Sequence, residues 1–284
     1  MVSVAAWILW LAVAQCRAIQ PKAAAVAGFD SYVRQVEARL APRNASGGSL
    51  QPVADAPLRG GELVIQKVTS DAVPDLPGAM LHHWRGTAFV PGAHAADFKR
   101  VMRDFDAYPR FFAPEVTSAR VLSQDGNRYR VRMRIRQTHV LTVVLDTTYD
   151  VVFGEVDSRH GYSISRSTSV SEIEDAGKPD ERTLTPAQGN GFLWRLNTYW
   201  SYVERDGGLY LQIETVSLTR AIPPGLGWAV GPFVESVPKE SLEFTLRRVC
   251  DAVKAGASGV SGVRGVSGVR GVSGVSPENE RRTH

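Results

Sequence analysis

Residues 101–122 read VMRDFDAYPRFFAPEVTSARVL, and this stretch decides the fold. It joins the end of a helix predicted for Ala95–Phe105, a short aromatic turn, and the start of a strand at Val116–Leu122. Pro109 and Pro114 prevent a long helix in the turn, because proline lacks the N–H group that a helix interior needs. Strand-like runs follow until one last helix. This order predicts a curved sheet closed over a long helix, a shape that encloses a hydrophobic cavity.

The clearest strand is Tyr129–Ile135, where apolar residues alternate with arginines. A period of two places the apolar residues on one face and five arginines on the other, namely Arg128, Arg130, Arg132, Arg134 and Arg136. Two interpretations of this arginine face are open. It is either a solvated convex face whose arginines pair with acids such as Asp146 and Asp150, or a surface that attracts an anionic membrane.

The other strands form a meander. Trp84–Val90 precedes the helix at Ala95–Phe105. Leu141–Phe153 and Tyr162–Thr168 follow the arginine strand, and Trp194–Val203 pairs with Leu209–Leu218 in a hairpin. Short connections of this kind make a sheet antiparallel. In the last helix we expect Pro238 in the first turn. Its apolar stripe is formed by Leu242, Leu246, Val249 and Val253.

These elements predict an α+β protein with an antiparallel sheet of about six to seven strands, two short helices after the first strand, and a long C-terminal helix. The predicted organisation is a signal peptide at 1–18, an extension and linker at 19–79, the main domain at 80–254, and a flexible tail at 255–284. The extension contains a possible amphipathic helix at Phe29–Leu40. The tail repeats Gly, Val, Ser and Arg without an apolar face to bury.

Compartment is predicted from the N-terminus. Val4–Ala14 is almost wholly apolar, too short to span a bilayer comfortably, and ends in small residues before Gln15. We therefore expect export to the periplasm or the medium. A retained membrane anchor, or a cytoplasmic protein with a wrongly assigned start, is the alternative.

Bulk composition excludes several classes of function. The 284 residues are 43% hydrophobic and 22% charged, which suits one sizeable core, and the formal net charge is +4. No nucleic-acid-binding motif accompanies the basic residues. The sequence lacks a CxxC pair, a phosphate-binding glycine motif, a G-x-S-x-G elbow and a metal-ligand spacing around His82, His83 and His94, so we expect no cofactor and no metal. Cys250 is interpreted as a small buried apolar residue.

The order of elements resembles the START-like superfamily, also called SRPBCC or polyketide cyclase-like, whose fold is the helix grip. The resemblance covers roughly residues 80–254 and is carried by residues 101–122, the hairpin YWSYVERDGGLYLQIETVSLTRAIP, and the final helix. It implies an antiparallel sheet wrapped around the C-terminal helix with an apolar cavity between them. Members bind sterols, lipids, quinones, plant hormones or polyketides, and a minority are aromatases or cyclases. The superfamily has no universal catalytic residue, so none is transferred.

The expected function is therefore non-enzymatic binding of a hydrophobic, lipid-like small molecule. Aromatic and apolar residues are the candidates to line the cavity, or else they form ordinary core: Tyr108, Phe111, Phe112, Tyr129, Met133, Trp194, Trp200, Tyr202, Trp228 and Phe233. The alternative is a cyclase or aromatase acting through a cavity acid such as Glu214. If Glu214 instead faces outward, we expect it to be a solvated charge, and its strand pattern favours that side.

Overall fold

The structure is a computed structural model. It describes residues 20–46, 50–51, 53–68, 76–138, 142–222 and 227–263, with side chains omitted for 227–235 and 258–263. The predicted signal peptide, Leu141, Cys16 and the tail beyond residue 263 lie outside this description. The helices are α2 (Ala23–Ser46), α3 (Asp55–Arg59), α4 (Ala95–Arg103), the short 3-10 helix η1 (Phe105–Ala107), α5 (Tyr108–Phe111) and α6 (Gly227–Val263). Among the residues described, no helix has the length and apolar character needed to cross a membrane.

One antiparallel sheet carries the fold. Its strands are β1 (Val64–Lys67), β2 (Ala79–Pro91), β3 (Val116–Asp125), β4 (Arg128–Thr138), β5 (Thr142–Glu155), β6 (His160–Glu174), β7 (Arg182–Thr183), β8 (Arg195–Arg205) and β9 (Gly208–Arg220). They are ordered β1-β2-β9-β8-β6-β5-β4-β3, and β7 pairs with the end of β6. The sheet has more strands than predicted, because the short strands β1 and β7 add to the meander.

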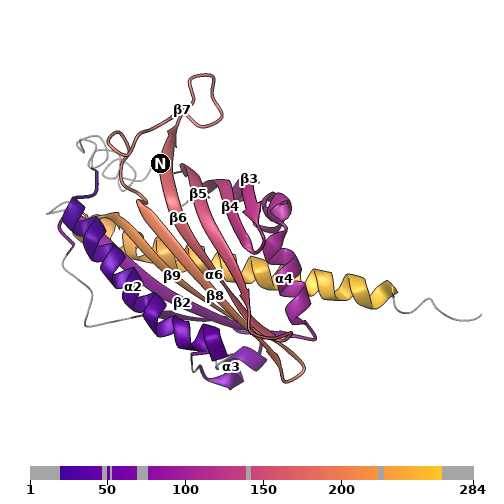
Figure 1. The fold of residues 1–284 in the computed structure, drawn as a ribbon. Coiled ribbons are helices and arrows are strands. Elements are labelled where there is room, and N and C mark those ends of the chain that lie inside the picture. Colours follow the sequence, from indigo (N-terminus) through magenta and orange to yellow (C-terminus); the bar gives the residue numbers. More distant parts are fainter. Residues whose placement is uncertain are drawn as a thin grey trace, which may run out of the picture.

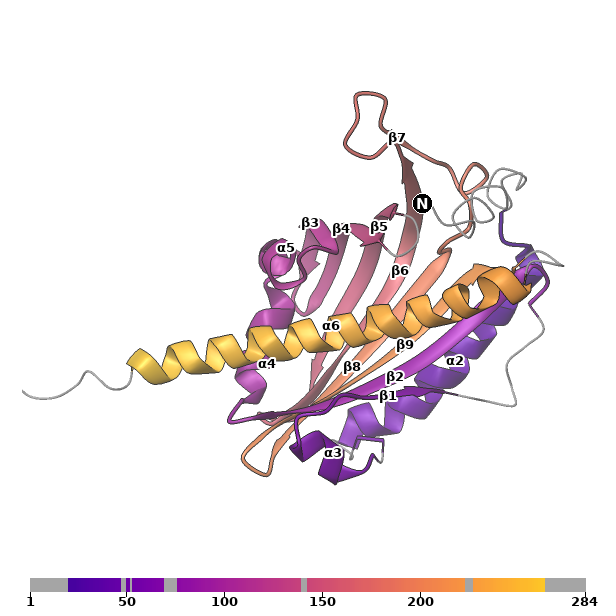
Figure 2. The same ribbon diagram turned by 180° about the vertical axis from the view of Figure 1, so that it is seen from behind.

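Helix α6 crosses the concave face of the sheet (Figure 2). Its predicted stripe of Leu242, Leu246 and Val249 is buried in the main core. The close backbone contacts between α6 and the sheet are concentrated on β1, β2 and β9. Gly86 in β2 allows this approach, since a Cβ atom there would lie 3.0 Å from the methyl groups of Leu242 and Leu246. The predicted helix-grip fold is confirmed by this arrangement.

The predicted start of the last helix is wrong. Helix α6 begins at Gly227, so Pro238 lies inside the helix and not in its first turn. A proline inside a helix costs one backbone hydrogen bond, but most helix stability comes from packing, and α6 packs along the sheet.

Part of the convex face of the sheet, over β2, β9 and β8, is covered by α2 (Figure 1). Four residues of α2 at helical spacing are buried, namely Phe29, Val33, Val36 and Leu40, as the sequence predicted. They pack against Val216 and Leu218 of β9, together with Trp194. The sheet therefore carries α6 on its concave side and, over part of its width, α2 on its convex side.

The aromatic turn within residues 101–122 belongs to the main core. Tyr108 and Phe112 are buried, and their rings meet edge to face with centroids 4.9 Å apart. The Tyr108 hydroxyl donates a hydrogen bond of 2.8 Å to the backbone oxygen of Met102. These contacts anchor the turn to α4 and close one end of the core.

Candidate functional site

Several side chains on the concave face of the sheet are only partly buried. Since even residues of β2 and odd residues of β4 face α6, strand pairing identifies the inward residues of the other strands. Among the inward residues that remain partly exposed, although α6 crosses this face, are Met133 and Ile135 on β4, Ser165 and Ser167 on β6, and Leu196 and Thr198 on β8. We call the partly exposed surface that they form the concave groove. It lies on β4, β6 and β8, whereas α6 packs most closely on β1, β2 and β9.

The groove has a mixed lining. Met133, Ile135 and Leu196 supply apolar surface, whereas Ser165, Ser167 and Thr198 supply hydroxyl groups. The Ser167 hydroxyl already accepts a hydrogen bond of 2.9 Å from the Leu196 backbone N–H. A lining of this kind suits a mainly apolar molecule with a few neutral polar groups, because binding sites are largely hydrophobic with few placed hydrogen-bonding groups.

Seven of the predicted cavity residues gather at the main core on the concave side. Tyr108, Phe112, Trp200 and Tyr202 are buried in that core, and three partly buried residues pack against it: Phe111, Tyr129 and Met133. The rings of Trp200 and Tyr202 both contact Phe98 of α4, with centroids 5.5 Å and 5.1 Å away. The buried four fill the core, and Met133 borders the groove itself.

Trp194 lies elsewhere. Alternation along the predicted strand Trp194–Val203 would place it on one face with Leu196, Trp200 and Tyr202, but it packs in the cluster under α2. The physical reason is that Trp194 precedes β8, so strand alternation does not fix its direction. The two remaining candidates, Trp228 and Phe233, lie outside the residues whose side chains are described.

A buried charge network lies on the convex face beneath α2. Glu214 of β9 has only 1% of its side chain exposed and meets three guanidinium groups. Arg39 and Arg43 reach it from α2, and Arg85 reaches it from β2, with the shortest N–O distances being 2.5, 3.8 and 3.2 Å. The His83 ring nitrogen Nε2 lies 3.1 Å from the same carboxylate. Glu214 thus faces outward from the grip, as predicted, but the expectation of a solvated charge is wrong because α2 covers it.

The network sets the protonation of its members. Burial would raise the pKa of Glu214, but hydrogen bonds from His83 and Arg39 and the charges of Arg85 and Arg39 hold it well below its usual range. Burial lowers the pKa of His83, against the opposing effect of Glu214. The His83 nitrogen Nδ1 lies 2.9 Å from the Tyr32 hydroxyl. A carboxyl group whose pKa is this low stays ionised and is a poor general acid. Glu214, the acid considered for the enzymatic alternative, is therefore ionised and lies on the convex face, outside the grip.

Sequence reasoning missed this network. Its signal was available, because Arg39 and Arg43 are four residues apart and therefore share a helix face near Val36 and Leu40. What the pattern left open was which surface that face would cover.

The arginine face of β4 is paired with acids. Arg130 contacts Asp150 at 2.8 Å and Arg134 contacts Glu181 at 2.9 Å. Arg132 pairs with Asp146. The predicted pairing with Asp146 and Asp150 is confirmed, and much of the charge on this face is compensated.

Metal and thiol chemistry find little support. Within the described ranges, no group of three or more His, Cys, Asp or Glu side chains could hold a metal ion. His82 faces the concave side and contacts the Thr219 hydroxyl at 3.0 Å, whereas His83 faces α2. Cys250 is buried, and burial raises the pKa of its thiol to about 12, so the interpretation as a small apolar core residue is confirmed.

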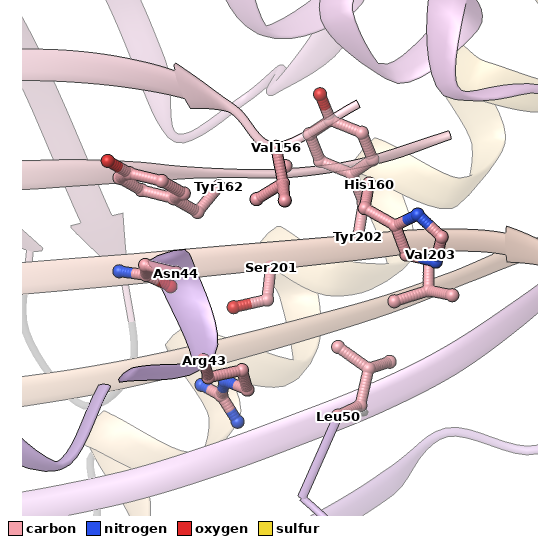
Figure 3. A pocket seen from close by; sticks show the side chains of 10 residues that line it. Arg43, Asn44, Leu50, Val156, His160, Tyr162, Ser201, Tyr202 and Val203 are labelled. Atoms are coloured by element: carbon pink, nitrogen blue, oxygen red, sulfur yellow. The ribbon is translucent and has the colours of Figure 1, made fainter. Parts of the chain in front are cut away.

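A small pocket lies on the convex face where α2 ends (Figure 3). Arg43, Asn44 and Leu50 border it on one side, and Tyr162 and Ser201 border it on the other. Its free volume of about 10 Å³ is room for about one water molecule. It is too small for an organic ligand.

Comparison with known proteins gives solved structures only. No protein-family model and no curated protein sequence matches this chain. A STAR-related lipid transfer protein from Xanthomonas axonopodis is 17% identical, over 67% of this chain and 98% of that chain, with a TM-score of 0.42. Human STARD10 is 11% identical, over 72% and 81%, with a TM-score of 0.43. The Zhui aromatase/cyclase from Streptomyces is 16% identical, over 67% and 100%, with a TM-score of 0.37.

Identities this low bear on the fold alone, and TM-scores below 0.5 add no weight to it. The helix-grip assignment therefore rests on the strand order and on the path of α6.

Proposed function

We propose that this protein binds a hydrophobic, lipid-like small molecule in the concave groove, without catalysing a reaction on it. The observation that supports this most directly is the partly exposed inward lining of β4, β6 and β8 beneath α6. Apolar surface that a core leaves open is a binding opportunity, since burying it is worth about 25 cal/mol per Å². The START-like resemblance points the same way, because that fold encloses apolar ligands.

The test is native mass spectrometry of the full chain, followed by organic extraction of whatever co-purifies. A matched pair of variants locates the site. Ser165→Trp fills the groove, whereas Ser169→Trp places the same side chain on the same strand but facing the convex side. We expect Ser165→Trp to lose the bound molecule, and uptake of the neutral dye Nile red, while Ser169→Trp retains both. Equal binding by both variants, or none by the parent chain, refutes the proposal.

The two alternatives have weaker support. The enzymatic one loses Glu214 and Asp146, which face the convex side in ion pairs, and keeps His82 as its inward histidine. Attachment to an anionic membrane through the arginine strand is opposed by the acids that pair with Arg130, Arg132 and Arg134. Flotation with anionic vesicles tests this second alternative.

We also propose that the protein works outside the cytoplasm. The support is the apolar run Val4–Ala14 with its small residues before Gln15. Mass measurement of the mature N-terminus after expression decides the matter, because an intact Met1 contradicts cleavage.

A further inference from the structure

The charge network beneath α2 holds more positive than negative charge. Three guanidinium groups, those of Arg39, Arg43 and Arg85, meet the single carboxylate of Glu214. His83 adds no positive charge near neutral pH, because burial lowers its pKa. Burial and the charges of the other two arginines also lower the pKa of the Arg43 guanidinium, and only Glu214 opposes them. Surplus positive charge is therefore held at Arg43, which is mostly buried.

One nitrogen of Arg43 is a donor without an acceptor. Its Nε–H group is buried and makes no hydrogen bond to any residue that the structure describes. The remainder of the guanidinium is engaged, since Nη1 donates a hydrogen bond of 3.2 Å to the Gln212 side-chain oxygen and Nη2 lies 3.8 Å from Glu214. A buried donor that has lost water and gained no acceptor is costly. An acceptor beside Nε would remove this cost.

Arg43 borders the small pocket at the end of α2 (Figure 3). Ser201 lies on the opposite side of that pocket, and its hydroxyl points toward the side formed by Asn44 and Arg43 (Figure 3). Strand pairing fixes this position, because Ser201 is the cross-strand neighbour of both Gln212 and Tyr162 on the convex face. Two donors from separate elements, the Nε–H group of α2 and the hydroxyl of β8, therefore border one small space.

We propose that this pocket binds one small inorganic anion, a halide such as chloride. The anion accepts hydrogen bonds from Arg43 Nε and from the Ser201 hydroxyl, and its charge compensates the surplus beneath α2. Size selects the halide, because the free volume of about 10 Å³ holds about one water molecule and chloride is only slightly larger. Sulfate and phosphate are too large for the same space.

Two nearby negative groups oppose the anion only weakly. The pocket lies at the C-terminal end of α2, and such a helix end carries about half an elementary negative charge, which solvent and salt screen. The exposed carboxylate of Asp157 contacts His160, another residue of the pocket, at 2.7 Å. Asp157 also accepts hydrogen bonds from the backbone N–H groups of Arg159 and His160, so its charge is largely engaged.

A bound anion has a structural consequence. It joins the end of α2 to β8 and stabilises the folded chain, because the unfolded chain has no such site. The pocket lies on the convex face, whereas the concave groove lies on the other face of the sheet. Anion binding is therefore independent of the function proposed for the groove.

The test is thermal unfolding of the full chain while chloride replaces gluconate at constant ionic strength, which keeps general screening unchanged. We expect the melting temperature to rise by about 3–6 °C once chloride reaches roughly ten times its dissociation constant. A melting temperature that is the same in both salts overturns the proposal, because the pocket then holds water only.

Two variants locate the effect. Ser201→Asp supplies a carboxylate where the anion binds, and we expect it to lose the chloride dependence. Ser169→Asp is the matched control, since it places the same carboxylate on the same convex face but at an exposed position outside the pocket. It should keep the parent's dependence. Chloride dependence that both variants retain means that the ion binds elsewhere and overturns the assignment.

A second measurement needs no variant to fold. Crystals of the parent chain grown with bromide should show an anomalous-scattering peak between Arg43 and Ser201. Bromide peaks confined to other parts of the surface would contradict the site.

Discussion

Replacing Glu214 by glutamine removes the negative charge on which Arg39, Arg43 and Arg85 converge beneath α2. The Glu214 side chain is 1% exposed, and those of Arg43 and Arg85 are only 11% and 14% exposed, so water cannot replace the lost charge easily. Breaking a buried ion pair by removing one partner costs about 3–5 kcal/mol. This is a large part of the total stability of a typical domain, about 5–15 kcal/mol.

The assay is equilibrium urea unfolding at pH 7.5, followed by tryptophan fluorescence and circular dichroism. We expect the midpoint to fall without a change in slope, and the melting temperature to fall by about 6–20 °C. Asp150→Asn is the matched control, because Asp150 pairs with Arg130 on the same convex face but both side chains are about half exposed. It should cost far less than Glu214→Gln, because ion pairs between exposed side chains contribute little to stability.

The reasoning would be refuted by a Glu214→Gln variant that loses no more stability than Asp150→Asn. Such a result would mean that solvent reaches the three guanidinium groups, and that α2 does not seal the convex face. A selective increase in protease cleavage within α2 of the Glu214→Gln variant would support the opposite view, that this network fastens the helix to the sheet.

Three further changes test other parts of the structure. Burial lowers the pKa of His83 in the folded protein. The stability that depends on neutral His83 is therefore present above the ordinary pKa of about 6.5 and is lost as the pH falls through the folded-state pKa. Urea unfolding between pH 7.5 and 5 should show this loss of stability, and His83→Gln should make the loss smaller. Gly86→Val should destabilise the fold by about 1–3 kcal/mol in thermal unfolding, because its side chain would crowd Leu242 and Leu246; an unchanged melting temperature would contradict the close α6–β2 contact. Glu172→Gln should cost about 1–3 kcal/mol and speed hydrogen exchange at residues 190–192, because the buried carboxylate accepts bonds from the backbone N–H groups of Asn190, Gly191 and Phe192; unaltered exchange there would mean that the loop is held by other contacts.

The sequence by itself determined the elements and their order. Alternation along β4 separated the arginines from the inward residues, and the spacing of Leu242, Leu246 and Val249 defined the buried stripe of α6. Likewise, Phe29, Val33 and Val36 marked the buried face of α2 before its partner was known. These features are periodic, and a period is a property of the local backbone that any stretch of sequence carries with it.

The tertiary structure alone decided what each face meets. The alternation of side chains along β9 shows which residues share a face with Glu214. Only the position of α2 shows that this face is buried and not solvated. The same holds for the concave groove, because only the position of α6 close to β2 shows that Ser165 and Thr198 stay partly exposed. It holds again for Arg248, whose guanidinium donates a hydrogen bond to the Ala113 backbone oxygen across more than a hundred residues of chain. Contacts between distant elements depend on packing, and no local pattern encodes them.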